Sequence, residues 1–112
     1  MLFNKKNQVI TALVTPFLNN YEVDYDSLTS LIEHQIKQGI DALLLLGTTA
    51  ESATLNEAEK NTVIKHALEV INDRVPVILG VGSNCTKTTI GDHKKAKSLG
   101  VYASLILSLI HI

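Results

Sequence analysis

An unbroken apolar run that ends in a glycine, two hydroxyls and a carboxylate constrains the fold of this chain most strongly: residues 43–52 read LLLLGTTAES. A strand this apolar is buried on both faces, which is typical of a parallel sheet covered by helices. Ligands of α/β sheets and barrels bind beyond the carboxyl ends of such strands. Gly47, Thr48, Thr49 and Glu51 follow the strand at that edge. A turn without any ligand, using glycine for backbone freedom and threonine for capping, explains the same residues.

Four apolar, strand-like runs alternate with helical patterns, at residues 9–14, 42–46, 75–81 and 102–107. The second to fourth runs start roughly 30 residues apart, the length of one βα unit with its loops. The chain has 112 residues, fewer than the ~250 of a complete α/β barrel. The pattern predicts a single α/β domain of about three and a half βα units. Periodicity leaves open a small doubly wound sheet or the first part of a barrel.

The first two helices carry clear start signals. Asp24 can cap a first helix that ends at Gly39, and its inward stripe consists of Leu28, Leu31, Ile32 and Ile36. A second helix is predicted to start at Thr54, because Thr54 and Glu57 form a T-x-x-E capping box. Its apolar stripe runs towards Asn72.

A third helix, from about Thr86 to Leu99, is more weakly signalled. Gly91 interrupts it, and Gly100 ends it. Its predicted apolar face consists of Ile90, Ala96 and Leu99.

Composition argues for a globular protein and against nucleic acid or a membrane surface as a partner. Apolar residues make up 46% of the chain and the net charge is −1, which is not the charge of a nucleic-acid or anionic-membrane binder. Lys94, Lys95 and Lys97 are interpreted as a solvated helix face. Cys85 is the single cysteine, and no apolar run is long enough to cross a membrane, so we expect a reducing, cytoplasmic compartment.

No motif in the chain predicts a metal or a cofactor. The segment Gly80-Val81-Gly82-Ser83-Asn84 lacks the third glycine of a dinucleotide fingerprint. Its glycines are interpreted as sites of close backbone approach to a neighbour or a ligand, and Asn84 as a turn former or polar contact. Four histidines, His34, His66, His93 and His111, fall on separate predicted elements without the spacing of helical metal ligands.

Three motifs on successive βα junctions are similar to one known family. The segments are Ala12-Leu-Val-Thr-Pro-Phe17, Gly47-Thr-Thr-Ala-Glu-Ser-Ala-Thr-Leu55 and Val77-Ile-Leu-Gly-Val-Gly-Ser-Asn84. In this order and spacing they resemble the N-terminal part of the dihydrodipicolinate synthase family of pyruvate-dependent class I aldolases. The resemblance runs from about Val9 to about Ser108. The second threonine and the Ser-Ala-Thr-Leu continuation favour the synthases over N-acetylneuraminate lyase-like relatives.

The resemblance implies the first half of a (β/α)8 barrel and a lyase that needs no cofactor. In the family, a lysine near the sixth strand forms an imine with pyruvate, and the derived enamine attacks aspartate semialdehyde in lysine and diaminopimelate biosynthesis. Thr48 matches a proton-relay threonine, and Thr49 matches the threonine that holds the pyruvate carboxylate. A hydroxyl both donates and accepts, as a relay requires, and N–H groups that open a helix suit a carboxylate. The full-length parent is expected to be a homo-oligomer.

Departures from the family pattern limit what the chain is expected to do alone. Ala50 stands where glycine is usual, which is tolerated if φ is negative. Residues 109–112 replace a Tyr-containing segment, and the imine-forming lysine has no counterpart. Lys37, Lys60 and Lys87 do not follow predicted strands. We therefore expect this chain alone to be inactive, with the last residues divergent.

Feedback by lysine and a non-catalytic role are two further questions that the sequence raises. In feedback-inhibited relatives, lysine binds near the positions of Ser52, Ala53 and Asn84, with histidines nearby on the helix. Glu57 and Lys60 stand there instead, so we expect a lysine-insensitive parent. A self-sufficient α/β module that binds an anion at the Thr48-Thr49 loop is the alternative of a different class.

Overall fold

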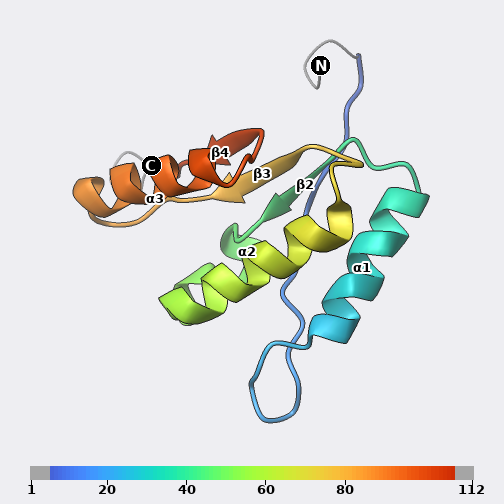
Figure 1. Cartoon of the computed structure of the whole chain (residues 1–112), viewed down its shortest axis with the longest axis horizontal. Helices are drawn as coiled ribbons and strands as arrows, with labels where there is room; N and C mark the ends of the chain where they lie inside the picture. Colours follow the sequence, from blue (N-terminus) through green and yellow to red (C-terminus); the bar gives the residue numbers. More distant parts are fainter. Residues whose placement is uncertain (1–5, 108–112) are drawn as a thin grey trace.

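The computed structural model describes residues 6–107 and consists of a parallel sheet with helices packed on it (Figure 1). The sheet has four strands in the order β1-β2-β3-β4: β1 (Ile10–Ala12), β2 (Ala42–Leu45), β3 (Val77–Gly80) and β4 (Ala103–Leu105). All three neighbouring pairs are parallel. Each strand lies inside a predicted apolar run and is shorter than it.

Three α-helices connect the strands: α1 (Tyr25–Lys37), α2 (Glu57–Ile71) and α3 (Thr86–Ser98). Consecutive parallel strands are neighbours, so right-handed crossovers place every helix on the same face of the sheet. Side-chain contacts agree, since Thr11 of β1 donates to Gln35 of α1 at 2.7 Å and Ser104 of β4 hydrogen-bonds His93 of α3 at 2.9 Å. In Figure 1, α1 and α2 lie next to each other and α3 lies beside β4.

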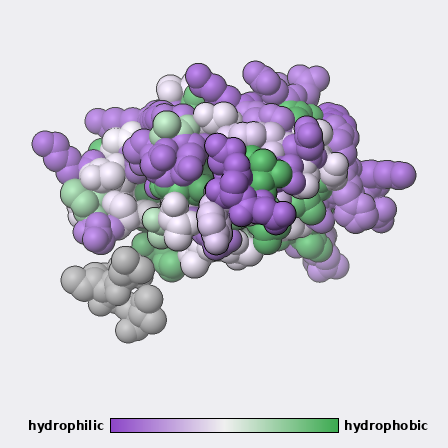
Figure 2. Space-filling model, turned by 90° about the horizontal axis from the view of Figure 1, so that it is seen from below, coloured by the Kyte–Doolittle hydropathy of each residue, from purple (hydrophilic) through white to green (hydrophobic). Residues whose placement is uncertain are grey.

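The core lies between the helices and one face of the sheet. Parallel pairing aligns Thr11 with Leu43 and Leu43 with Val77, so these side chains share the helix-facing side. Leu43 is fully buried. The helices cover this face with Leu28, Ile32, Val63, Ile64, Ala67, Ile71 and Ala96, all of them buried. Figure 2 shows one side of the molecule, on which hydrophilic side chains predominate and apolar ones emerge in smaller patches.

Helix α1 forms as predicted. The Asp24 carboxylate caps it by accepting from the Ser27 N–H at 3.0 Å and from the Ser27 hydroxyl at 2.6 Å. These hydrogen bonds, the hydroxyl one first, lower the pKa of Asp24. The helix ends at Lys37, and Gly39 follows with φ of +83°, a left-handed conformation that glycine adopts without strain.

The predicted start of the second helix is wrong by two residues. Asn56, not Thr54, is the N-cap of α2: its side chain accepts from the Glu59 N–H and the Glu59 carboxylate accepts from the Asn56 N–H, both at 2.8 Å. Thr54 instead ends the short 3-10 helix η3 (Ser52–Thr54) and donates to the Glu51 carbonyl oxygen at 2.8 Å. A second box of the type N-x-x-E two residues downstream therefore caps the helix.

Helix α3 spans the predicted residues, but one side chain of its predicted face is exposed. Ala96 is fully buried and Leu99 packs against the core, whereas Ile90 is 51% exposed. Ile90 precedes Ala96 by six residues, which places the two side chains about 120° apart around the helix. Gly100 follows the helix with φ of +81°, as its predicted terminating role requires.

Candidate functional site

The threonine pair lies at the carboxyl end of an interior strand, as predicted. β2 has neighbours on both sides, and the chain leaves it through Leu46 and the buried Gly47 into the 3-10 helix η2 (Thr48–Ala50). Thr48 and Thr49 are both exposed, while Ala50 is 2% exposed and does not have a positive φ. The expectation that alanine is tolerated at position 50 is met by this backbone.

The sequence suggested that N–H groups at the start of a helix would bind a carboxylate at the threonine pair. The structure has only a short 3-10 helix at this position. The N–H groups of Thr48 and Thr49 open a single 3-10 turn, whose own bonds run from Ala50 to Gly47 and from Glu51 to Thr48. Helix α2 begins only at Glu57. Because the dipole of a helix acts within its own first turn, the α2 N-terminus does not supply a field at Thr48.

Two glycines, at the end of β3 and in the loop that follows it, let the backbone pass closely, as the sequence indicated. A Cβ on Gly80 would lie 2.3 Å from the Leu46 carbonyl oxygen, and one on Gly82 would lie 3.1 Å from the Leu107 nitrogen. Leu46 itself has φ of +53°. The ends of β2, β3 and β4 are thus drawn together at one edge of the sheet, where the loops that follow them meet.

A pocket of about 600 Å³ opens at this edge. Gly47, Thr48 and Glu51 of the predicted cluster line it together with Asn84, and Thr49 does not. Its other walls come from Ser52, Lys60, Gly80, Ser83, Leu105 and Leu107. The structure therefore brings Thr48 and Asn84 to one concavity and leaves Thr49 on the adjacent exposed turn.

Lys60 is the site residue that the sequence reasoning set aside. It belongs to α2, not to a strand end, yet its side chain lines the pocket beside Thr48. The Lys60 ammonium lies 3.6 Å from the Glu57 carboxylate. Helical periodicity places residues 57 and 60 on one face of α2, which was the available signal.

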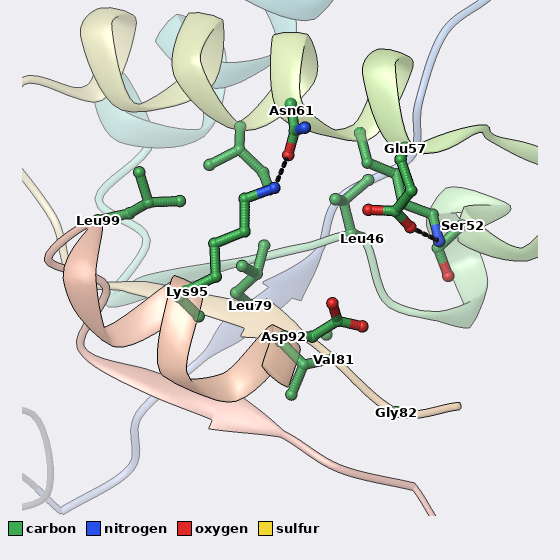
Figure 3. Close-up of a pocket in the computed structure, with 14 residues that line it drawn as sticks. Leu46, Ser52, Glu57, Asn61, Leu79, Val81, Gly82, Asp92, Lys95 and Leu99 are labelled. Carbon is green, nitrogen blue, oxygen red and sulfur yellow. Dashed lines mark hydrogen bonds and ion pairs between the residues drawn. The ribbon is translucent and has the colours of Figure 1, made fainter. Parts of the chain in front are cut away.

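A second, smaller cavity of about 60 Å³ lies between α2, α3 and the ends of β2 and β3 (Figure 3). Four charged side chains line it: Glu57, Lys60, Asp92 and Lys95. In Figure 3 the Lys95 side chain reaches from α3 to Asn61 of α2, and its ammonium donates to the Asn61 side-chain oxygen. Two acidic and two basic groups line the cavity, so their charges balance across the polar boundary between α2 and α3.

Two of the histidines, His66 and His93, make side-chain contacts with neighbouring elements. His66 hydrogen-bonds the Thr29 hydroxyl at 2.7 Å and packs on the Tyr25 ring, whose centroid is 5.0 Å away. Burial raises the pKa of Tyr25. His34 is exposed, and His111 lies outside the described residues. Within residues 6–107, no three His, Cys, Asp or Glu side chains are grouped so as to hold a metal ion.

Two further features concern the surface of the described chain. Cys85 is exposed, and hydrogen bonds with Thr88 lower the pKa of its thiol. Among residues 6–107, no helix has the length and apolar character that a membrane crossing requires.

Comparison with known proteins gives the family of the chain. The model of the Dihydrodipicolinate synthetase family matches residues 5–108. The chain belongs to this family. Its relatives include the 4-hydroxy-tetrahydrodipicolinate synthase of Ehrlichia canis, 45% identical over 92% of this chain, and that of Bacillus subtilis, 44% identical over 89%. The match covers 35% and 34% of those two relatives, so the chain spans about a third of their length.

Solved dihydrodipicolinate synthase structures confirm the barrel assignment. The enzyme of Thermotoga maritima superposes with a TM-score of 0.84 at 41% identity, over 88% of this chain and 33% of that one. The Acinetobacter baumannii enzyme, solved in complex with pyruvate, superposes with a TM-score of 0.85 at 42% identity, over 88% and 34%. The four-stranded sheet is therefore the N-terminal part of a synthase (β/α)8 barrel, and the doubly wound alternative is excluded.

Proposed function

We propose that this chain is the N-terminal part of a 4-hydroxy-tetrahydrodipicolinate synthase, a cytoplasmic, homo-oligomeric lyase that condenses pyruvate with aspartate semialdehyde through a lysine imine. The observation that supports this most directly is the Gly47-Thr48-Thr49 turn at the carboxyl end of β2. It borders a pocket in a fold whose relatives carry this enzyme name.

Thr48 is proposed as the proton-relay residue. Its hydroxyl accepts and donates at the same time, so it can pass a proton between two other groups without a net change of its own. Its position on the wall of the pocket supports this role, because a relay must reach the reacting atoms. The β-branched side chain has few χ1 rotamers, which fixes the direction of the hydroxyl.

Thr49 is proposed to bind the pyruvate carboxylate. Thr49 is exposed at the start of η2, and neither its hydroxyl nor its N–H is used by the hydrogen bonds of that turn. The carboxylate would accept from these donors directly, without the helix dipole that the sequence had suggested.

The nucleophile must come from outside this chain. Among residues 6–107, the lysine that lines the pocket with Thr48 is Lys60, which is held on a helix beside Glu57. An imine-forming lysine needs to be neutral and aimed at the carbonyl carbon, for which a dry position is the usual arrangement. We therefore expect the 112-residue chain to form no imine with pyruvate.

A chimera tests the proposal. Residues 6–107 would replace the matching third of the Bacillus subtilis synthase. The chimera is expected to condense pyruvate with aspartate semialdehyde and to gain the mass of a reduced pyruvate adduct on borohydride treatment, whereas the 112-residue chain gains none. A folded chimera without condensation activity would contradict the proposal, and so would a stable adduct on the short chain.

The exposed apolar residues of β1 and β4 speak against a self-sufficient anion-binding module. Ile10 is 40% exposed and Leu105 47% exposed, although both belong to sheet strands. A module selected to fold alone would cover such edges or place charges on them. The synthase fragment explains these residues, since a complete barrel buries both strands.

A further inference from the structure

The backbone at Leu46 has an unusual conformation directly before the threonine turn. Its φ is +53°, in the left-handed region that residues with a Cβ adopt rarely. Leu46 follows β2 directly, and β2 has a neighbouring strand on each side. Such conformations persist only where the surrounding structure holds them, and they cluster at functional sites. The neighbours of Leu46 must therefore supply the free energy that this conformation costs.

Leu46 breaks the alternation of side chains along β2. Leu45 is 2% exposed on the helix-facing side, so regular alternation would place Leu46 on the opposite face with Leu44. Leu46 is instead 5% exposed and lines the cavity between α2 and α3. Figure 3 shows its side chain beneath α2, on the same side of the sheet as Leu79. The left-handed φ thus turns the Leu46 side chain to the helix side.

The chain turns to the other side of the sheet immediately after Leu46. A Cβ on Gly47 would lie 3.2 Å from the Leu44 Cδ2 atom, and Leu44 points away from the helices. The Gly47 backbone therefore passes over the face that becomes the interior of a barrel. Thr48 follows at once and lines the pocket. An extended φ at Leu46 would continue the strand and carry Thr48 away from this face.

Two features hold Leu46 in the left-handed conformation. Its side chain is anchored in the hydrophobic core, in the same cluster as Ile64 and Leu79. Its carbonyl group packs against Gly80, where a Cβ would lie 2.3 Å from the Leu46 oxygen. Burial of a leucine side chain stabilises a fold by as much as one left-handed residue costs, or by more. The buried side chain is therefore able to maintain the turn.

We infer that Leu46 is a positioning residue, whose anchored side chain and left-handed backbone hold Thr48 and Thr49 in the direction that the reaction needs. This inference rests on the roles proposed above for the two threonines. Leu46 acts through the turn that follows it, since its own side chain is directed into the core. A displacement of ~1 Å in a reacting group can cost about 10²-fold in rate. Loss of the anchor should therefore lower kcat and raise KM for pyruvate together.

Three substitutions of Leu46 in the chimera with the Bacillus subtilis synthase test the inference. Leu46→Ala removes the anchor and keeps a Cβ that disfavours a positive φ, so kcat/KM for pyruvate should fall by about 10²-fold. Leu46→Gly also removes the anchor but adopts the left-handed φ freely. Its kcat/KM should therefore exceed that of Leu46→Ala by about tenfold. Leu46→Met keeps the buried volume and should stay within about threefold of the parent.

Leu79→Ala is the matched control. Leu79 is 4% exposed and lines the same cavity between the helices, but it belongs to β3 and has no positive φ. Its kcat/KM should stay within about threefold of the parent, although the same side-chain volume is lost. Circular dichroism at the assay temperature verifies that every variant is folded.

The order of the glycine and alanine variants separates positioning from packing. If Leu46 only filled space, Leu46→Gly would be the poorer of the two, because glycine is less favourable than alanine wherever φ is negative. That order would overturn the inference. Equal losses of kcat/KM in Leu46→Ala and Leu79→Ala would overturn it as well.

Crystal structures of the parent chimera and of its Leu46→Ala variant separate this inference from the proposed function. Residue 46 should have a positive φ in the parent and an extended one in the variant, with Thr48 displaced by about 1 Å or more. An unchanged turn in the variant would overturn the inference, whatever the activity. A folded parent chimera that condenses nothing, in which the substitution nevertheless displaces Thr48, would contradict the proposed function and support the positioning role.

Discussion

Gly80 lies against the backbone of Leu46, so closely that a Cβ at position 80 would be 2.3 Å from the Leu46 carbonyl oxygen. The neighbouring atom is backbone, which cannot rotate away. Gly80→Ala must therefore separate the ends of β2 and β3, and we expect it to lower the free energy of unfolding by about 1–3 kcal/mol. Urea denaturation at a fixed protein concentration measures this.

Gly91→Ala is the matched control for Gly80→Ala. A Cβ on Gly91 meets nothing within 4 Å, and the residue lies inside α3 without a positive φ. Alanine at this position should raise the free energy of unfolding by about 0.5–1 kcal/mol. Equal losses in the two variants would show that the contact with Leu46 is not the cause.

The capping of α2 gives a second prediction, because the sequence offers two boxes and the structure uses one. Asn56→Ala removes the acceptor for the Glu59 N–H and should cost about 1 kcal/mol of unfolding free energy. Thr54→Ala removes a hydroxyl that donates to the Glu51 carbonyl in an exposed turn, and should cost less. The reverse order of the two losses would place the start of the helix at Thr54. Thermal unfolding followed at 222 nm distinguishes the two outcomes.

The strands and helices could be predicted because their signals are local. An apolar run such as residues 42–46 identifies a buried parallel strand, and Asp24 three residues before Ser27 identifies a cap. The start of α2 could not be predicted from such signals. Thr54-x-x-Glu57 and Asn56-x-x-Glu59 both fit a capping box. Glu51 has a left-handed φ of +57° and begins the 3-10 turn η3. Thr54 is the last residue of that turn and is therefore not the cap of α2.

The site could be predicted only where it follows a strand. Thr48 and Asn84 come directly after β2 and β3, so the carboxyl-end rule locates both. Lys60 and Glu57 reach the same region from a helix, through side chains whose direction depends on how α2 packs. That packing is a tertiary property, and the sequence pattern shows only that residues 57 and 60 share a face.

Acid sensitivity gives a third prediction. The hydrogen bonds from Ser27 lower the pKa of Asp24 in the folded chain. A carboxyl whose folded pKa lies below its unfolded value stabilises the fold above the unfolded pKa, ~3.9. That contribution is lost as the pH falls through the lower, folded pKa. Asp24→Asn keeps a capping side chain but does not titrate, so its denaturation midpoint should fall less steeply below about pH 4 than that of the parent.

Ser27→Ala checks the cause of this effect. It leaves the Asp24 carboxylate in place and removes the hydroxyl that donates to it at 2.6 Å. The pKa of Asp24 should then rise towards its ordinary value, and the acid slope should become shallower, as in Asp24→Asn. A parent-like slope in both variants would remove Asp24 as the source. Denaturation midpoints between pH 2.5 and pH 7 decide the matter.

Lysine insensitivity of the assembled enzyme is a fourth prediction. Lys60 and Glu57 form an ion pair at 3.6 Å and line the polar cavity beside Ser52. The Lys60 ammonium repels the cationic ends of a lysine ligand, and Glu57 is already paired with it. The chimera with the Bacillus subtilis synthase is expected to keep full activity at millimolar lysine. Half-maximal inhibition in that range would contradict the prediction, provided that the chimera turns over normally without lysine.

The two threonines are predicted to affect different kinetic constants of the same chimera. Thr48→Val removes the relay hydroxyl at nearly unchanged shape and should lower kcat by about 10²-fold or more, within the range of general acid–base effects. Thr49→Val removes a carboxylate donor and should mainly raise KM for pyruvate, by about tenfold, the equivalent of one hydrogen bond to a charged group. Thr49→Ser should restore it. Thr54→Val, an exposed threonine of the next turn, is the control and should change neither constant. If Thr48→Val and Thr54→Val behave alike in an active, folded chimera, the relay assignment fails, because the hydroxyl that lines the pocket would then carry no proton in the reaction.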